Sequence, residues 1–395
     1  MQARSVIDDA TPLRGATICM LLIGDPAHDA RVRKEAEALS DAGASVDLVY
    51  GAPALIDTDW HWGSSTHVPT PIASKARAKL ARVSANLNRE RAFDRELGRI
   101  AADHAARIYH CHDLNTLRSG LRAARATGAL VVYDAHELFT EAGTWKEWRR
   151  RSFARFERDA LQHVDLVIAA NTERARVMRD EYGAPQTPLV IMNSPRSAVI
   201  GAEPSGEVIR MREATGASTL LLYQGRVHPA RGLDAVIDGL LELPQDTHLA
   251  VMGTGDTQGL QKHADEVGVS GRVHLWPIVP ADEVVPWAAV ADAGIVSYLP
   301  VNRNNRLCAP NKLFDYAAAG IAVVASDLSP LRAFLTNHPQ WLFEPGNASS
   351  FARAARAATH DTDGTSARQD MLVLARANSW ETQARKLVDA YEALV

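Results

Sequence analysis

The fold is decided by residues 17–50, TICMLLIGDPAHDARVRKEAEALSDAGASVDLVY. The apolar run Thr17–Ile23 predicts a buried strand, and Val46–Tyr50 predicts a second one. Between them, Ala30–Asp41 is typical of a helix whose N-cap is Asp29. Because two strands joined through a helix lie parallel and are covered on both faces, this stretch predicts a βαβ unit of an α/β fold.

The same alternation continues as far as residue 191, breaks, and restarts at residue 219. The break at Asn193–Gly206 has two prolines and little periodicity, which is typical of a linker. We therefore expect two doubly wound halves that face each other across a cleft, with ligands at the carboxyl ends of the strands. The further strands predicted are Arg107–His110, Leu130–Tyr133, Leu166–Ala169, Leu189–Ile191, Thr219–Tyr223, His248–Met252, Val273–Trp276, Ala293–Ser297 and Ile321–Ala325.

Composition narrows the class of protein. The 395 residues carry a net charge of −4, which argues against a general nucleic-acid binder. Three scattered cysteines, Cys19, Cys111 and Cys308, suit a reducing compartment rather than a disulfide framework. No signal peptide and no apolar run of membrane length is visible in the sequence, so we expect a cytoplasmic protein.

Two basic segments depart from the alternating pattern. Residues 72–102 predict a long helix, and Trp145 and Trp148 stand within a second cluster. A solvated helix face is one interpretation, and peripheral contact with an anionic membrane, at its inner face, or with an anionic acceptor is the other. The basic residues are Lys75, Arg77, Lys79, Arg82, Arg89 and Arg91 in the first segment, and Lys146, Arg149, Arg150 and Arg151 in the second.

The second half carries the most informative loop. The strand that ends near Gly225 is followed by Arg226 and Arg231, and a helix opens at Gly232. Glycine lets the backbone approach a ligand, and a helix N-terminus favours anions. Two guanidinium groups beside them can hold a diphosphate through paired hydrogen bonds. The alternative is a pair of exposed loop arginines.

Two further stretches in this half bear on the ligand. Gly253-Thr-Gly255 is a lone Gly-x-Gly, and Gln258 stands where a dinucleotide fingerprint has its third glycine, which argues against a nicotinamide enzyme. Pro310-Asn-Lys312 begins a helix, and Asp315 follows one turn later. A carboxylate there can accept two hydrogen bonds from a ribose diol, although a capped helix with an exposed Asp is the alternative.

In the first half, ionisable residues follow two neighbouring strands. They are His110-Cys-His112-Asp113 and Asp134-Ala-His136-Glu137. Since the carboxyl ends of parallel strands are where a site forms, these side chains are candidates for chemistry, with structural histidines as the alternative. No Cys/His spacing supports zinc and no Gly-x-Ser-x-Gly elbow is present, so we expect neither a metal site nor a serine hydrolase.

Taken together, the chain resembles GT-B-fold retaining glycosyltransferases of the family 4 type, also called glycosyl transferases group 1. The resemblance covers nearly the whole chain. The matching second-half motifs are Gly225-Arg226 with Arg231-Gly232, Gly253-Thr-Gly255, Val273–Pro277, and Pro310–Gly320 running into Val323–Ser326. The other matches are Asp29-x-Arg31-Val32, His112-Asp113, Asp134-x-His136-Glu137 and the ending Ser379-Trp380-Glu381.

The resemblance implies two Rossmann-like domains, at residues 1–197 for the acceptor and 198–377 for the nucleotide sugar. A C-terminal helix, 378–395, is expected to cross back onto the first domain. The implied reaction is α-glycosyl transfer from a nucleotide-diphosphate sugar, with a UDP-sugar favoured, to an acceptor hydroxyl. It implies no cofactor and no essential metal. Because no carboxylate of the second half is well placed as a nucleophile, we expect front-face attack, in which the leaving phosphate takes the proton of the acceptor. The acceptor classes are a glycan, a lipid-linked sugar or a small metabolite.

The resemblance also implies roles for single residues. Arg226 and Arg231 bind the diphosphate, and His112 is the active-site histidine near the sugar. Leu307 stands where the family has a Glu that touches the donor sugar, so Asn305, Asn311 or Lys312 are candidates to replace it. The donor-binding set is Gly225, Gly253, Gly255, Pro277, Ile278, Val279, Asn311, Lys312, Leu313 and Asp315. The acceptor-side candidates are His28, Asp29, Arg31, Asp113, His136 and Glu137.

Three other functions stay open at this stage. An inverting transferase of the same fold needs a general base, for which His28, Asp29 and Asp113 are candidates. A nucleotide-sugar 2-epimerase shares the fold and needs no acceptor. A catalytically inactive scaffold subunit is favoured by Leu307, whereas the arginines, the histidines and Asp315 argue against it.

Overall fold

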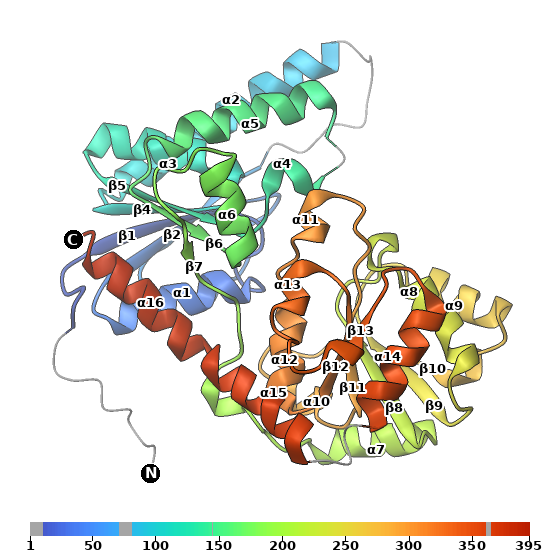
Figure 1. Ribbon diagram of the computed structural model, residues 1–395. Coiled ribbons are helices and arrows are strands. Elements are labelled where there is room, and N and C mark those ends of the chain that lie inside the picture. Colours follow the sequence, from blue (N-terminus) through green and yellow to red (C-terminus); the bar gives the residue numbers. More distant parts are fainter. Residues whose placement is uncertain (1–10, 71–80, 144, 361–364) are drawn as a thin grey trace. The chain divides into compact units, whose positions relative to one another are not determined.

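The computed structural model describes residues 11–70, 81–143, 145–360 and 365–395, with the backbone alone for residues 81–89 and 365. The chain forms two compact units. The first comprises Met1–Ile191 and Ala384–Val395, and the second comprises Met192–Gln383 (Figure 1). Because each unit has its own parallel sheet, each is described by itself.

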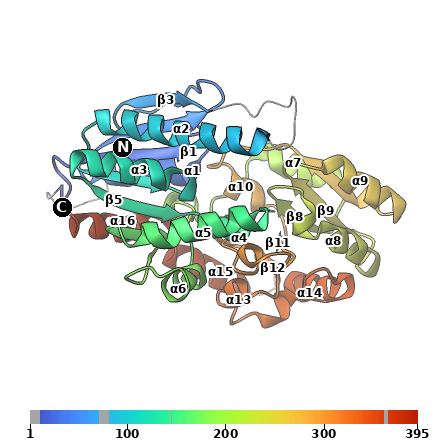
Figure 2. The same cartoon turned by 90° about the horizontal axis from the view of Figure 1, so that it is seen from above.

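The first unit is built on a seven-stranded parallel sheet with the order β3-β2-β1-β4-β5-β6-β7. Its strands are β1 (Thr17–Ile23), β2 (Ser45–Ala52), β3 (Ser65–Pro69), β4 (Ile108–His112), β5 (Leu130–Ala135), β6 (Leu166–Ala169) and β7 (Leu189–Val190). Its helices are α1 (Ala30–Asp41), α2 (Ala81–Asp103), α3 (Leu114–Thr127), α4 (Phe139–Ala142), α5 (Glu147–Leu161) and α6 (Thr172–Asp180). Seen from above, α2 lies along α3 (Figure 2).

The βαβ unit predicted from residues 17–50 is confirmed. β1 pairs with β2 in parallel, with Thr17 opposite Ser45 and Ile23 opposite Gly51. The carboxylate of Asp29 accepts hydrogen bonds from the backbone N–H groups of Arg31 and Val32, which satisfies two otherwise unpaired donors at the start of α1. The predicted long helix begins, in the described chain, at Ala81; the earlier part of residues 72–102, up to residue 80, lies outside the described residues.

The second unit has a six-stranded parallel sheet with the order β10-β9-β8-β11-β12-β13. Its strands are β8 (Thr219–Gln224), β9 (Thr247–Met252), β10 (Val273–Trp276), β11 (Ala293–Val296), β12 (Ala322–Ser326) and β13 (Leu342–Phe343). Its helices are α7 (Gly206–Thr215), α8 (Leu233–Gly239), α9 (Thr257–Glu266), α10 (Val284–Ala288), α11 (Arg303–Arg306), α12 (Asn311–Ala319), α13 (Ser329–Arg332), α14 (Ala348–His360), α15 (Thr365–Ala377) and α16 (Trp380–Glu392), whose last residues belong to the first unit. Short 3₁₀ turns are η1 (Ser197–Val199), η2 (Pro229–Arg231), η3 (Leu240–Glu242), η4 (Ser270–Arg272) and η5 (Pro339–Trp341).

Both sheets are doubly wound, as expected. The chain order reverses between β1 and β4 in the first sheet and between β8 and β11 in the second. In such sheets ligands bind beyond the carboxyl ends of the strands at the point of reversal. Each unit therefore has one such position. It lies at the carboxyl end of β4 in the first unit and at the carboxyl end of β8 in the second. In the described part of the chain, no helix combines the length and the apolar character needed to cross a bilayer.

Candidate active site

The loop after β8 lies at the point of reversal in the second sheet. Gly225 follows the strand with φ of 112°, a conformation that favours glycine. A Cβ built on Gly253, in the loop after β9, would clash with the carbonyl oxygen of Gly225. The two loops therefore pack backbone against backbone, and this close approach requires glycine at position 253.

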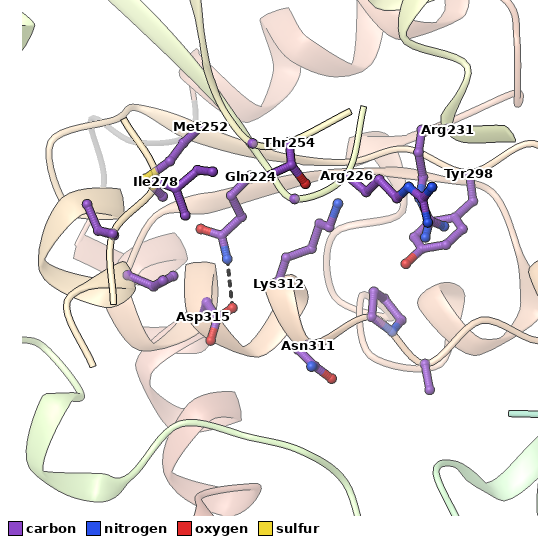
Figure 3. A pocket seen from close by; sticks show the side chains of 16 residues that line it. Gln224, Arg226, Arg231, Met252, Thr254, Ile278, Tyr298, Asn311, Lys312 and Asp315 are labelled. Carbon is purple, nitrogen blue, oxygen red and sulfur yellow. Dashed lines mark hydrogen bonds between the residues drawn. The ribbon is translucent and has the colours of Figure 1, made fainter. Parts of the chain in front are cut away.

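These loops and the start of α12 enclose a pocket of about 410 Å³ (Figure 3). Nine of the residues predicted for the donor site line it: Gly225, Arg226, Arg231, Gly253, Ile278, Val279, Asn311, Lys312 and Asp315. The lining also includes residues that were not predicted for the donor site: Gln224, Met252, Thr254, Val284, Tyr298, Ala309 and Pro310. The side chains of Arg226, Arg231 and Lys312 extend into the same part of the pocket (Figure 3).

Three of the predicted donor residues do not line this pocket. Gly255 forms an isolated β-bridge with Val227, and the side chain of Leu313 is completely buried in the core. Pro277 precedes the two lining residues Ile278 and Val279. Asn305, considered as a replacement for the missing Glu, donates its amide N–H to the carbonyl oxygen of Leu299 at 3.0 Å and lies outside the lining.

Asp315 is held in position by its neighbours. The side-chain amide of Gln224 donates to Asp315 Oδ2 at 2.7 Å (Figure 3). One residue further along α12, the Tyr316 hydroxyl accepts from the backbone N–H of Gln224 at 2.9 Å and donates to the carbonyl oxygen of Leu222 at 3.1 Å. These contacts fix the first turns of α12 to the end of β8. Gln224 could have been predicted from the sequence, because it is a polar residue at the end of an apolar strand, directly before Gly225.

The cations of the pocket rest on aromatic rings. The guanidinium of Arg231 lies 4.0 Å from the centre of the Tyr298 ring, and Lys312 Nζ lies 4.1 Å from the centre of the Tyr223 ring. Burial first, and then the charge of Arg231, lower the pKa of Lys312 to about 7, against the opposing charge of Asp315. Three cationic side chains beside a helix N-terminus suit an anion with more than one charge.

The first unit holds a second polar cluster, beyond the ends of β4 and β5. Both carboxylate oxygens of the buried Asp134 accept from Arg31, at 2.6 and 2.7 Å. His136 Nε2 lies 2.8 Å from Asp134 Oδ2 and 3.2 Å from His112 Nδ1. The structure thus brings together His112, His136 and Arg31 from three separate segments.

Charges in this cluster shift each other's titration. Burial alone would raise the pKa of Asp134, but Arg31 and His136 outweigh it and hold that pKa well below its ordinary value. Burial likewise opposes the proton on His136, yet Asp134 and Asp113 raise its pKa to about 9. Glu35 is completely buried beside Asp134. Burial and then the negative charge of Asp134 raise the pKa of Glu35 to about 8, against the opposing charge of Arg31.

Two models of known protein families match the chain. The model described as glycosyl transferases group 1 matches residues 218–361, and the glycosyl transferase 4-like domain matches residues 28–193. The chain belongs to the group 1 glycosyltransferases. The second matched segment contains the whole second sheet, and the first contains the first sheet except β1. Both polar clusters lie within these segments, so the family resemblance and the GT-B fold are confirmed.

Individual relatives of this group 1 glycosyltransferase are distant. A D-inositol 3-phosphate glycosyltransferase of Xylanimonas cellulosilytica is 26% identical over 251 residues, which span 60% of this chain and 58% of that relative. A sucrose-phosphate synthase of Thermosynechococcus elongatus has the same fold, with a TM-score of 0.73 at 17% identity over 96% of this chain and 99% of that one. Anabaena HepE, solved in complex with UDP-glucose, gives a TM-score of 0.71 at 15% identity over 95% and 99%.

The remaining acceptor-side candidates are dispersed. His28 is exposed and pairs with Asp25, and Asp29 is engaged as the cap of α1. Asp113 has φ of 63° and ψ of 166°, a strained conformation for a residue other than glycine. Its carboxylate accepts from the backbone N–H of His136 at 3.1 Å, which joins it to the cluster. Glu137, the residue after His136, is exposed.

Four buried side chains of the first unit, Glu35, His110, His112 and Asp134, place ligand-type atoms within 4.8 Å of one another. The rings of His110 and His112 stack, with centroids 4.3 Å apart and planes 25° apart. Arg31 already pairs with both carboxylates. Within the described chain, both oxygens of Glu35 and the Nε2 atoms of His110 and His112 have no hydrogen-bond partner, so hydrogen bonds satisfy the quartet only in part. The positive charge of Arg31 beside both carboxylates argues against a metal cation there.

The second basic cluster is largely neutralised by its neighbours. Arg149 pairs with Glu90 at 2.6 Å, and both Arg150 and Arg151 pair with Glu147 at 2.9 and 2.7 Å. These pairs support the interpretation as a solvated helix face. Of the first basic segment, Lys75, Arg77 and Lys79 lie outside the described residues, as do the side chains of Arg82 and Arg89.

Proposed function

We propose that the chain transfers a glycosyl group from a nucleotide-diphosphate sugar, with UDP as the favoured carrier, to an acceptor hydroxyl with retention of configuration. The observation that carries the proposal is the pocket of the second unit, in which Arg226, Arg231 and Lys312 gather opposite Asp315. Cations suit the diphosphate, and a carboxylate held by Gln224 suits the ribose hydroxyls. One protein of the same fold, Anabaena HepE, has been solved with UDP and with UDP-glucose, which supports this choice of carrier.

The proposed mechanism follows from the charge that develops. As the glycosidic bond to the phosphate breaks, negative charge grows on the leaving oxygen. Preorganised donors aimed at such a position stabilise the transition state without reorganisation. Arg226, Arg231, Lys312 and the N-terminus of α12 are the donors that we assign to this role. With cations from the protein itself at the diphosphate, we propose that the reaction proceeds without a metal ion and by front-face attack.

On the acceptor side we propose the cluster around His112. Asp134 and Asp113 hold His136 protonated, and His136 in turn lies beside His112. This cluster lies beyond the carboxyl ends of β4 and β5, the position at which the first sheet is expected to bind a ligand. The acceptor that we propose is a glycan, a lipid-linked sugar or a small metabolite with a free hydroxyl.

The binding test is a thermal unfolding assay with UDP, GDP, TDP and ADP in the presence of EDTA. A ligand that binds only the folded state at 100 times its Kd stabilises that state by about 2.7 kcal/mol. We expect UDP to raise Tm most and Arg226→Ala to remove most of that shift, while Arg353→Ala, an exposed site on α14, leaves the shift intact. No shift with any of the four nucleotides would contradict the donor site.

The configuration of the product tests the mechanism. With a donor whose anomeric carbon is α-linked, we expect an α-linked product, read from the anomeric coupling constant in an NMR spectrum. A β-linked product would indicate inversion and would require a general base on the acceptor side. Release of an epimerised sugar without any acceptor would indicate a 2-epimerase.

A further inference from the structure

Lys312 has an unusual position for a lysine. Its side chain belongs to the first turn of α12 and is only 8% exposed. Its Nζ lies 4.1 Å from the centre of the Tyr223 ring and 5.8 Å from that of Tyr298. A Cβ built on Gly225 would lie 3.2 Å from this nitrogen, so the glycine leaves the space in which the amine lies.

The surroundings of Lys312 lack a counter-ion in direct contact. Among the residues that the structure describes, no carboxylate lies within ion-pair distance of Lys312 Nζ. Asp315, one turn along the helix, is the nearest acidic influence, and it already accepts a hydrogen bond from Gln224. The titratable and charged groups that face Lys312 are Arg231 from η2, Asp315 and Cys308 from α12 and the loop before it, and the phenols of Tyr223 and Tyr298.

We propose that Lys312 takes up a proton from solvent when the donor diphosphate binds, and so becomes the third cation on the leaving group. The inference rests on the proposed function and specifies how its donor site is charged. The proton adds to the lone pair of Nζ, and no other bond is made or broken. The diphosphate places negative charge next to Lys312 Nζ, in the space into which the amine extends (Figure 3).

The pH dependence of binding follows from the burial of the amine. Burial and Arg231 lower the pKa of Lys312 to about 7, so above that pH the amine is mostly neutral in the free protein. An adjacent anion favours the charged form and raises this pKa in the complex. Above pH 7 binding therefore takes up a proton, and affinity falls as pH rises. The terminal phosphate of UDP, with a pKa of about 6, is already ionised in this range.

The experiment is isothermal titration calorimetry of the full chain with UDP, with GDP run in parallel, in three buffers of different ionisation enthalpy. The slope of the observed enthalpy against the buffer enthalpy gives the number of protons taken up. We expect uptake approaching one proton per nucleotide at pH 8. At pH 6 Lys312 is already protonated and takes up almost none, while the terminal phosphate of UDP, half protonated at that pH, releases up to about half a proton. Equal uptake at both pH values, or none at pH 8, would overturn the proposal.

Variants assign the proton to Lys312. Lys312→Arg keeps the charge at every accessible pH, so it should bind UDP with no uptake at pH 8. Lys312→Met should also show no uptake and should bind UDP at least tenfold more weakly at pH 6. The matched control, Lys262→Met, changes an exposed lysine of α9 and should keep the uptake of the unmodified chain. Undiminished uptake in Lys312→Arg would overturn the assignment.

The outcomes separate this inference from the proposed function. Binding of UDP without proton uptake rejects the role of Lys312 and leaves the donor site intact. Absence of binding by both nucleotides at either pH rejects the two together. The measurement on the unmodified chain decides the first point even if a variant fails to fold, which a far-UV circular dichroism spectrum and a Tm reveal.

Discussion

At the residue scale, Asp134 organises the polar interior of the first unit. It is completely buried and accepts two hydrogen bonds from the almost fully buried Arg31. Removing one partner of a buried ion pair leaves an uncompensated charge, which costs far more than the pair gains over an apolar replacement. Arg31 also donates to the carbonyl oxygen of Ile191 at 2.7 Å, so its loss leaves a backbone acceptor unpaired as well.

Arg31→Met is therefore expected to destabilise the protein by about 3–5 kcal/mol. Urea unfolding followed by circular dichroism measures the change. The control is Arg179→Met, which breaks an exposed pair with Asp180 and should cost less than about 1 kcal/mol. Equal effects of the two substitutions would show that Asp134 does not depend on Arg31.

Glu35 predicts a dependence of stability on pH. Its pKa is about 8 in the folded protein and near its ordinary 4.5 in the unfolded chain, because burial and then Asp134 disfavour its charge. Between these two pH values the carboxyl of Glu35 is protonated in the folded state and ionised in the unfolded state. Its favourable contribution to the free energy of unfolding is therefore fully present below pH 4.5 and is lost as pH rises towards 8.

Glu35→Gln mimics the protonated carboxyl at every pH and removes this dependence. The variant should gain stability relative to the unmodified chain as pH rises from 5 to 8. Urea unfolding of both proteins at the two pH values measures the difference. A difference in unfolding free energy that does not change with pH would contradict the assigned protonation state.

At the element scale, α12 carries the candidate site because it is fixed to the end of β8. Tyr316 and Asp315 contact β8 through Gln224 and Leu222, and the opening turn of α12 supplies Lys312. If Asp315 binds the ribose, its hydrogen bonds to the hydroxyls are charge-assisted, and each contributes about 1.5–3 kcal/mol.

A substitution in α12 paired with a changed nucleotide tests this contact. On the unmodified chain, 2′-deoxy-UDP should bind at least about tenfold more weakly than UDP. On Asp315→Ala the two nucleotides should bind equally. Calorimetry measures the four affinities, and discrimination that survives in the variant would place the ribose elsewhere.

The same elements show what the sequence can predict. Long apolar runs such as β1 and β8 were found because both faces of a parallel strand are buried. β3 was missed because Ser65–Pro69 is a mostly polar edge strand, and β13 because two residues carry no periodicity. At the site, glycine loops and helix starts located Arg226, Lys312 and Asp315, whereas Tyr298 comes from a loop after β11 with no such signal.

At the scale of the whole molecule, contacts between segments that lie far apart in the chain could not be predicted from the sequence. Tyr391 lies 281 residues from His110, yet its hydroxyl lies 2.6 Å from His110 Nδ1 inside the first unit. Arg31 and Asp134 are likewise 103 residues apart. In the sequence, each of these residues is an ordinary member of its own helix or strand. Only the packing of these elements shows that the residues form one network.

We propose that the donor nucleotide binds within the second unit, between the loops after β8 and β9 and the start of α12. Hydrogen–deuterium exchange of the full chain, with and without saturating UDP, locates the bound nucleotide. We predict protection in peptides that cover residues 224–231, 252–255 and 309–315, and little change around residues 110–113 and 134–137. Protection confined to the first-unit peptides, with the second unit unchanged, would contradict this proposal.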